Sequence, residues 1–204
     1  MNETAVQHLL RADQVLARVI RKVGPCPLAP RRGVPPYQAL VKSVTYQQLN
    51  GQAAATIFGR FLASFPGKKF PAPKDIVAAP DARLRSAGLS RAKTAAIKDI
   101  AAKTLEGIVP TRRVIAKMSD AEIIEQLTTI RGVGPWTVEM LLMFTLGRPD
   151  VLPATDYGVR CGFARVYGLK ELPLPKDLLT HGECWRPYRS VASWYFWRAL
   201  DTAK

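Results

Sequence analysis

Cysteine is scarce in this sequence of 204 residues. The three present, Cys26, Cys161 and Cys184, are odd in number and widely separated, and no CxxC pair offers metal-ligand spacing. We therefore predict reduced thiols in a cytoplasmic protein, with no metal site and no disulfide framework. A chain of this length buries roughly 70% of its unfolded surface and needs neither kind of cross-link to hold a core together.

Long apolar runs are also missing. The longest nearly apolar stretch, residues 140–146, is far too short to span a bilayer. Residues 1–24 carry Glu3 and Asp13 within their apolar pattern and contain no small-residue cleavage site, so they do not resemble a secretory signal. We therefore expect no membrane partner.

Acidic residues are few. The sequence has 16 Asp and Glu against 30 Lys and Arg, which gives a formal net charge of +14 and a pI near 10.1. Such an excess of positive charge favours a polyanionic partner, with nucleic acid as the first candidate. A basic, soluble surface without such a partner is the alternative, because charge alone identifies neither fold nor ligand.

Strand patterns and internal repeats are absent. Apolar residues instead recur at three- and four-residue steps, the spacing of one helix face. Ser90 is suited to cap a helix, and Ser119 with Glu122 forms the S-x-x-E pattern of a capping box. The sequence predicts an all-α fold in a single domain over 1–204. Helices are expected over 6–23, 37–48, 52–65, about 91–105, from about 120, and over 135–146, 157–167 and 187–203.

The segment LTTIRGVGPWT at 127–137 lies between two of these helices and places Gly132 and Gly134 in a tight turn. Glycine tolerates a positive φ and a close backbone approach, and Pro135 suits the first position of the helix that follows. The segment therefore predicts a helix-hairpin-helix motif at about 120–146. A plain helix-helix corner is the alternative, because GxG before a helix is a weak signal on its own.

The backbone N–H groups of the predicted hairpin suggest an anion-binding role. N–H groups in the turn and at the new helix end would face an outside anion, and the helix dipole favours a phosphate there. This contact needs no base and would hold any sequence. The residues expected to supply these groups are Gly132, Gly134, Trp136 and Thr137.

Five segments occur in a recognisable order between residues 47 and 200. They are QQLNGQAA at 47–54, AGLSRAK at 87–93, IRGVGPWT at 130–137, RPDVLPATDYGVR at 148–160 and WRPYRSVASWYFWRAL at 185–200. Together they resemble the helix-hairpin-helix DNA glycosylase superfamily, in particular its DNA-3-methyladenine glycosylase II branch. The resemblance implies two helical lobes flanking a DNA-binding cleft and a monomer acting on damaged double-stranded DNA. The implied reaction is hydrolysis of the N-glycosidic bond of alkylated purines, which leaves an abasic site.

The resemblance implies one catalytic carboxylate. The family carries an Asp about twenty residues after the hairpin, in the loop that opens the next helix, and that position is Asp156 here. Breaking the bond between base and deoxyribose develops positive charge on the sugar, which a fixed anion stabilises. The alternative is that Asp156 only caps the helix that begins at Tyr157.

The resemblance also has implications for whether the protein cuts the DNA strand. Members that cut the DNA strand have a Lys two residues after the second hairpin glycine, where its amine forms a Schiff base with the sugar. This chain has Trp136 there, which implies hydrolysis alone. The iron-sulfur cluster of another branch needs four cysteines, so no cofactor is expected.

Base extraction requires a wedge and a pocket. By resemblance Leu49 is the wedge and Gln48 its polar neighbour, while Trp136 and Trp197 match aromatic positions of the base pocket. A buried turn residue is the alternative for Leu49, and core packing is the alternative for the tryptophans. Met140 stands where close relatives have an aromatic residue, which leaves the range of accepted bases open.

Two other functions fit parts of the sequence. A non-catalytic helix-hairpin-helix module would explain the charge and the hairpin but not Asp156 or Leu49. An RNA- or ribosome-associated basic protein would explain the charge alone.

Overall fold

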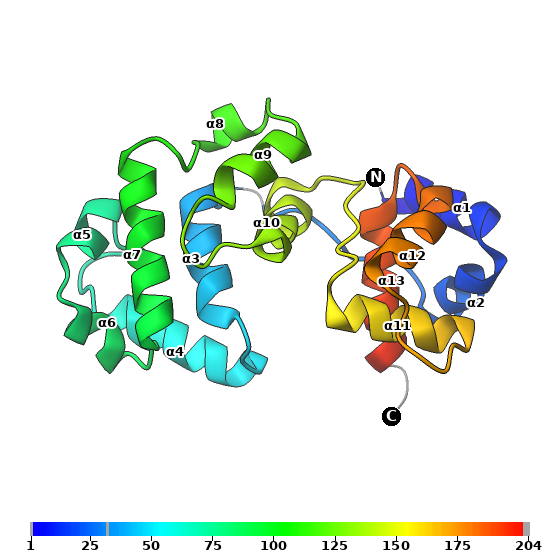
Figure 1. The fold of residues 1–204 in the computed structure, drawn as a ribbon, viewed down its shortest axis with the longest axis horizontal. Coiled ribbons are helices and arrows are strands. Elements are labelled where there is room, and N and C mark those ends of the chain that lie inside the picture. Colours follow the sequence, from blue (N-terminus) through cyan, green and yellow to red (C-terminus); the bar gives the residue numbers. More distant parts are fainter. Residues whose placement is uncertain (1, 32, 202–204) are drawn as a thin grey trace. The chain divides into compact units, whose positions relative to one another are not determined.

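The computed structural model describes residues 2–31 and 33–201, and every regular element within these ranges is a helix (Figure 1). The all-α prediction is therefore confirmed. None of the described helices is long and apolar enough to cross a membrane. The elements are α1 (Asn2–Ala12), α2 (Gln14–Val23), α3 (Pro36–Tyr46), α4 (Gly51–Ala63), α5 (Pro73–Ala78), α6 (Asp81–Ser86), α7 (Arg91–Leu105), α8 (Arg112–Ile115), α9 (Asp120–Leu127), α10 (Pro135–Leu141), the π-helical turn η1 (Leu142–Leu146), α11 (Tyr157–Tyr167), α12 (Pro175–His181), the 3-10 turn η2 (Gly182–Trp185) and α13 (Arg189–Asp201).

The chain divides into two compact units. Unit 1 combines the N-terminal segment up to Arg31 with the C-terminal segment from Leu142, and unit 2 is formed by the chain between them. A single domain over 1–204 stays a prediction.

Unit 1 has its core where α11 and α13 pack together. A Cβ at position 162 would lie 2.1 Å from the carbonyl oxygen of Phe196, so these backbones approach closely only because residue 162 is a glycine. Trp185, Tyr195 and Phe196 are fully buried beside this contact. Burial of such large aromatic side chains is a main source of stability for a unit of this size.

The N-terminal helix differs from its prediction. One helix was expected over 6–23, but the structure has two, α1 and α2, separated at Asp13. The Asp13 Oδ1 atom accepts hydrogen bonds of 3.0 Å from the N–H groups of Val15 and Leu16, so this residue caps α2 instead of continuing α1.

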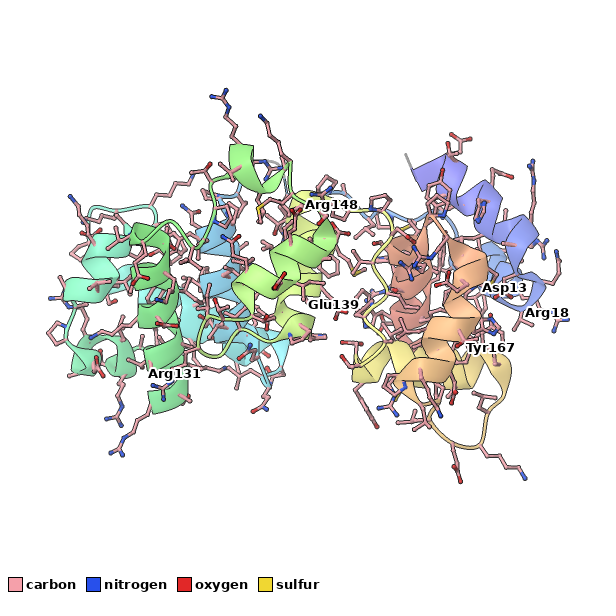
Figure 2. All side chains as sticks on the ribbon, turned by 45° about the horizontal axis from the view of Figure 1, so that its top comes forward. Asp13, Arg18, Arg131, Glu139, Arg148 and Tyr167 are labelled. Atoms are coloured by element: carbon pink, nitrogen blue, oxygen red, sulfur yellow. The ribbon has the colours of Figure 1, made fainter. Side chains whose placement is uncertain are left out.

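The other Asp13 oxygen explains why the break lies there. Oδ2 accepts hydrogen bonds from the Tyr167 hydroxyl and from Trp185 Nε1 at 2.8 Å, and it lies 3.3 Å from His181 Nε2. Figure 2 labels Asp13, between α1 and α2, and its partner Tyr167 at the end of α11. Burial alone would raise the pKa of Asp13, but the hydrogen bonds from Tyr167, the Leu16 N–H and Trp185 lower it overall. A buried carboxylate with this many donors ties α2 to the C-terminal half of unit 1.

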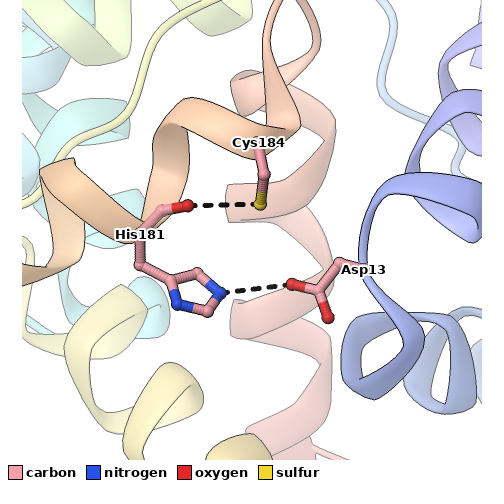
Figure 3. A group of neighbouring side chains, drawn as sticks. All are labelled: Asp13, His181 and Cys184. Carbon is pink, nitrogen blue, oxygen red and sulfur yellow. Dashed lines mark hydrogen bonds and ion pairs between the residues drawn. The ribbon is translucent and has the colours of Figure 1, made fainter.

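Cys184 lies beside the same group, and its Sγ donates to the His181 carbonyl oxygen at 3.2 Å (Figure 3). Single ligand atoms of Asp13, His181 and Cys184 lie within 4.8 Å of one another. A metal ion here would have to displace the Tyr167 and Trp185 donors from Asp13, so we interpret the group as a structural hydrogen-bond network.

Unit 2 is organised around α7. Helices α3 and α5 pack against it, and α3 also contacts α10 (Figure 1). Ile97 and Ile100 of α7 and Leu40 and Val44 of α3 are fully buried, as expected for facing helix stripes. The predicted caps are confirmed here, since the Ser90 hydroxyl accepts from the Lys93 N–H.

Four short α-helices were not predicted: α5, α6, α8 and α12. Each has four to seven residues, too few to show a repeat of 3.6. Pro73 and Pro175 stand in the first turns of α5 and α12. Proline is favoured at the first position of a helix, although it breaks a helix interior, so these prolines begin helices here. The helix expected over 135–146 is continuous but changes to π geometry at Leu142.

Candidate functional site

The hairpin, residues 128–134, connects α9 to α10 in unit 2. The capping box starts α9, with the Glu122 carboxylate accepting from the Ser119 N–H at 2.7 Å. Gly132 has a φ of 75°, and a Cβ there would lie 2.7 Å from the Ala96 Cβ of α7. The predicted need for glycine is therefore confirmed at this position. Gly134 does not have a positive φ, and a Cβ there would meet nothing within 4 Å.

The N–H groups of the hairpin fall into two classes. Those of Gly132 and Gly134 donate to no group within the described part of the chain. The Arg131 N–H, by contrast, donates to Asp99 Oδ2 of α7 at 2.7 Å. The Thr137 N–H, which the sequence assigned to phosphate, donates to the Gly134 carbonyl at 2.9 Å within the first turn of α10. Within the described part of the chain, these two glycine N–H groups are therefore left without an acceptor.

The two glycines give a matched pair of variants. Gly132→Ala is expected to cost about 1–2 kcal/mol of unfolding free energy for the left-handed backbone alone, with a further loss from the overlap with Ala96. Gly134→Ala is expected to cost less than about 0.5 kcal/mol. Urea denaturation of both variants measures the difference, and equal losses would contradict the strained geometry at Gly132.

The turn at residues 47–50 joins α3 to α4 in the same unit. Gln48 is the one non-glycine residue with positive φ, 54°, in the described ranges. Asn50 caps α4 through a 2.8 Å bond from the Ala53 N–H. The Leu49 side chain remains 39% exposed, which excludes its interpretation as a buried turn residue. Strained backbone occurs often at functional sites, so the exposed Leu49 that follows Gln48 is a candidate for a functional role.

The hairpin and the 47–50 turn are linked by a residue that the sequence analysis missed. Gln47 Nε2 donates to the Gly132 carbonyl oxygen at 3.1 Å and to Thr137 Oγ1 at 2.9 Å. Thr137 is 2% exposed, so its hydroxyl accepts this bond in the interior. No local pattern could have identified Gln47, because its partners lie 85 and 90 residues away.

Asp156 belongs to unit 1, where it is the N-cap of α11. Its Oδ1 accepts hydrogen bonds from the Val159 N–H at 2.7 Å and from Trp197 Nε1 at 2.8 Å. Two donors on one oxygen fix the orientation of the half-buried carboxylate group. The predicted cap is confirmed, and the bond to the indole is a further constraint.

Gly158 makes room for that indole. A Cβ at position 158 would lie 2.9 Å from Trp197 Cδ1, 3.0 Å from its Nε1 and 3.2 Å from Asp156 Oδ1. Trp197 also stacks on Phe144, with ring centroids 5.8 Å apart and an interplanar angle of 28°. The structure thus brings Asp156 and Trp197 together, although 41 residues separate them.

The other predicted aromatic, Trp136, lies in the first turn of α10 in unit 2. It is half-buried, as is Met140 one helical turn later. Residues four apart share a helix face, so Met140 adjoins Trp136 on α10.

Residues 41–187 match the family described as HhH-GPD superfamily base excision DNA repair protein. The chain is 38% identical to DNA-3-methyladenine glycosylase 1 of Schizosaccharomyces pombe, in an alignment over 96% of this chain and 86% of that protein. The fold is similar to the solved structure of the 3-methyladenine DNA glycosylase of the same organism in complex with abasic DNA. That match has a TM-score of 0.90 and 37% identity, and it covers 98% of both chains. A DNA-3-methyladenine glycosidase from Bacillus halodurans is similar as well, with a TM-score of 0.85 and 34% identity over 97% of this chain and 89% of that one.

Proposed function

This chain belongs to the HhH-GPD superfamily of base excision DNA repair proteins, and we propose that it is a monofunctional DNA-3-methyladenine glycosylase of type II. It hydrolyses the N-glycosidic bond of alkylated purines in duplex DNA and leaves an abasic site. The observation that carries this proposal is the carboxylate of Asp156, oriented by two donors on a single oxygen. The names of its similar relatives agree with the same reaction.

The chemistry fits one carboxylate. As the base departs, the deoxyribose acquires oxocarbenium character, and a preorganised anion stabilises that charge. The same carboxylate can hold the attacking water and accept its proton. An alkylated purine such as 3-methyladenine is cationic and leaves as a neutral molecule, so a separate general acid is less necessary. Asp156 therefore suffices for bases that are good leaving groups.

In this proposal, unit 2 binds the DNA backbone. The N–H groups of Gly132 and Gly134 bind a phosphate, and the net charge of +14 attracts the duplex without regard to sequence. The exposed Leu49 occupies the space of the extracted base, with Gln48 beside it. We propose Trp136 and Trp197 as surfaces that receive the base, and Met140 as a determinant of its size. A monomeric state and a cytoplasmic location remain predictions.

The experiment that tests the function is incubation of the protein with methylated duplex DNA, followed by chromatography of the released bases. Free 3-methyladenine should appear with time, and an undamaged duplex should release none. Binding of the duplex without release would favour a non-catalytic DNA-binding module. Preference for RNA with no release from DNA would favour the third interpretation.

The product of the reaction gives a separate prediction. Because Trp136 stands where a strand-cutting member has lysine, the product strand should stay intact until alkali or an abasic-site endonuclease is added. Denaturing gel electrophoresis before and after alkali measures this. A covalent protein–DNA adduct trapped by borohydride would show that an amine of this chain attacks the sugar, contrary to the monofunctional assignment.

A further inference from the structure

The 47–50 turn holds a backbone conformation that needs support. The left-handed φ of Gln48 costs free energy for a residue with a side chain. Leu49 directly follows and keeps 39% of its surface exposed, so packing within the chain covers it only in part. The contacts that hold this turn must therefore come from its neighbours.

One support is Lys93, in the first turn of α7. Its Nζ donates to the carbonyl oxygens of Thr45 and Gln47, both at 2.8 Å. A cation at a helix C-terminus satisfies carbonyls that have no partner within the helix, and it interacts favourably with the dipole of α3. Burial lowers the pKa of Lys93, as expected for an ammonium group drawn out of water to reach these oxygens.

The second support is the Gln47 side chain, which extends to the hairpin. Its Nε2 donates to the Gly132 carbonyl oxygen at 3.1 Å and to Thr137 Oγ1 at 2.9 Å. Gly132 is one of the two glycines whose N–H groups donate to no group within the described part of the chain. Gln47 is therefore held through its own carbonyl by Lys93, and it holds the hairpin through its amide.

We propose that Gln47 is a positioning residue, which fixes the Leu49 wedge in register with the phosphate-binding hairpin, and that Lys93 fixes Gln47 in turn. The inference rests on the proposed function, since it assigns Leu49 to the base stack and the hairpin to the backbone. DNA held at a phosphate by Gly132 and Gly134 then meets Leu49 at a set distance. Because the turn is already ordered, inserting Leu49 into the duplex does not incur the entropic cost of ordering the turn.

The test uses Gln47→Leu, which keeps the size of the side chain and removes its donors. Thr137→Val, which removes one of the two acceptors, is the second variant. Gln126→Leu is the matched control, because Gln126 Nε2 also donates to a backbone carbonyl in unit 2, that of Ile108 at 2.7 Å, which is not part of the hairpin. The probe is a duplex with a tetrahydrofuran abasic site beside 2-aminopurine, whose fluorescence rises when it unstacks. Affinity for an undamaged duplex is measured in parallel.

We expect Gln47→Leu to lower the affinity for the abasic duplex about tenfold, the effect of losing one or two hydrogen bonds. The increase in 2-aminopurine fluorescence on binding should be smaller as well. Thr137→Val should have a smaller effect, and Gln126→Leu none. Affinity for undamaged duplex should stay within about twofold, because the hairpin N–H groups remain.

A double-mutant cycle with Leu49→Ala separates positioning from a general structural role. If Gln47 acts through Leu49, Gln47→Leu should cause no further loss once Leu49 is truncated. Full additivity, or an unchanged fluorescence rise in the folded Gln47→Leu variant, would overturn the inference while leaving the proposed function intact. A wild-type protein that releases no base from methylated duplex would overturn the proposed function and the inference with it.

Discussion

Asp156→Asn is expected to slow base excision by about a hundredfold or more while the protein stays folded. Asparagine retains an Oδ1 that can accept from the Val159 N–H and from Trp197 Nε1, so both hydrogen bonds of the native carboxylate can persist. Asparagine also caps helices about as well as aspartate, and the unfolding free energy should change little. The variant thus removes the charge and keeps the geometry.

The measurement is single-turnover excision from methylated duplex DNA, with protein in excess. The loss should be greatest for bases that leave reluctantly and milder for cationic bases, whose bond to the sugar is already weak. Affinity for DNA should stay the same or rise slightly, because an anion has been removed from a protein that binds a polyanion.

Asp177→Asn provides the matched control for Asp156→Asn. Asp177 is an exposed residue in the first turn of α12 in the same unit, so its substitution removes one negative charge without touching α11. Its excision rate should equal that of the wild type. Wild-type speed for Asp156→Asn itself, with the fold intact, would reduce Asp156 to a helix cap and support the non-catalytic interpretation.

The second large effect is expected for Leu49→Ala. The residue is 39% exposed and its truncation opens no enclosed cavity, so the unfolding free energy should fall by no more than about 1 kcal/mol. Unstacking a base costs a few kcal/mol, and loss of the wedge that offsets part of this cost should slow excision about tenfold to a hundredfold. The effect should be smaller for a damaged base that is already mispaired.

Excision rates on paired and mispaired substrates, with affinity for undamaged duplex, check this prediction. Leu105→Ala is the matched control, a 59% exposed leucine at the end of α7 in the same unit. Equal slowing on both substrates, or normal excision by a destabilised Leu49→Ala protein, would argue that Leu49 has a role in folding and not in base extraction.

Predictions from sequence succeeded where the signal and its effect lie within a few residues. The capping box of Ser119 and Glu122 does start α9, Ser90 does cap α7, and Asp156 does cap α11. A cap needs only a side-chain oxygen and an N–H group two or three residues later, so the local sequence contains the whole interaction. The positive φ of Gly132 was likewise predictable from the local sequence.

Predictions failed where the deciding partner is distant. The apolar spacing over 6–23 favours one helix, whereas Asp13 caps α2, and its burial depends on donors from Tyr167 and Trp185, more than 150 residues away. Helices of four to seven residues were missed for a different reason, because they are too short for any period to show.

The amino-acid sequence by itself determined the helical class, the glycine turn of the hairpin and the cap of α11 at Asp156, because periodicity, caps and glycine requirements act over one or two turns. Only the tertiary structure decided what holds these parts in place. Trp197 reaches Asp156 across 41 residues, and Gln47 reaches Gly132 and Thr137 across 85 and 90. Such bonds leave no local pattern, since they exist only after the helices have packed and brought distant backbone and side-chain groups within hydrogen-bond distance.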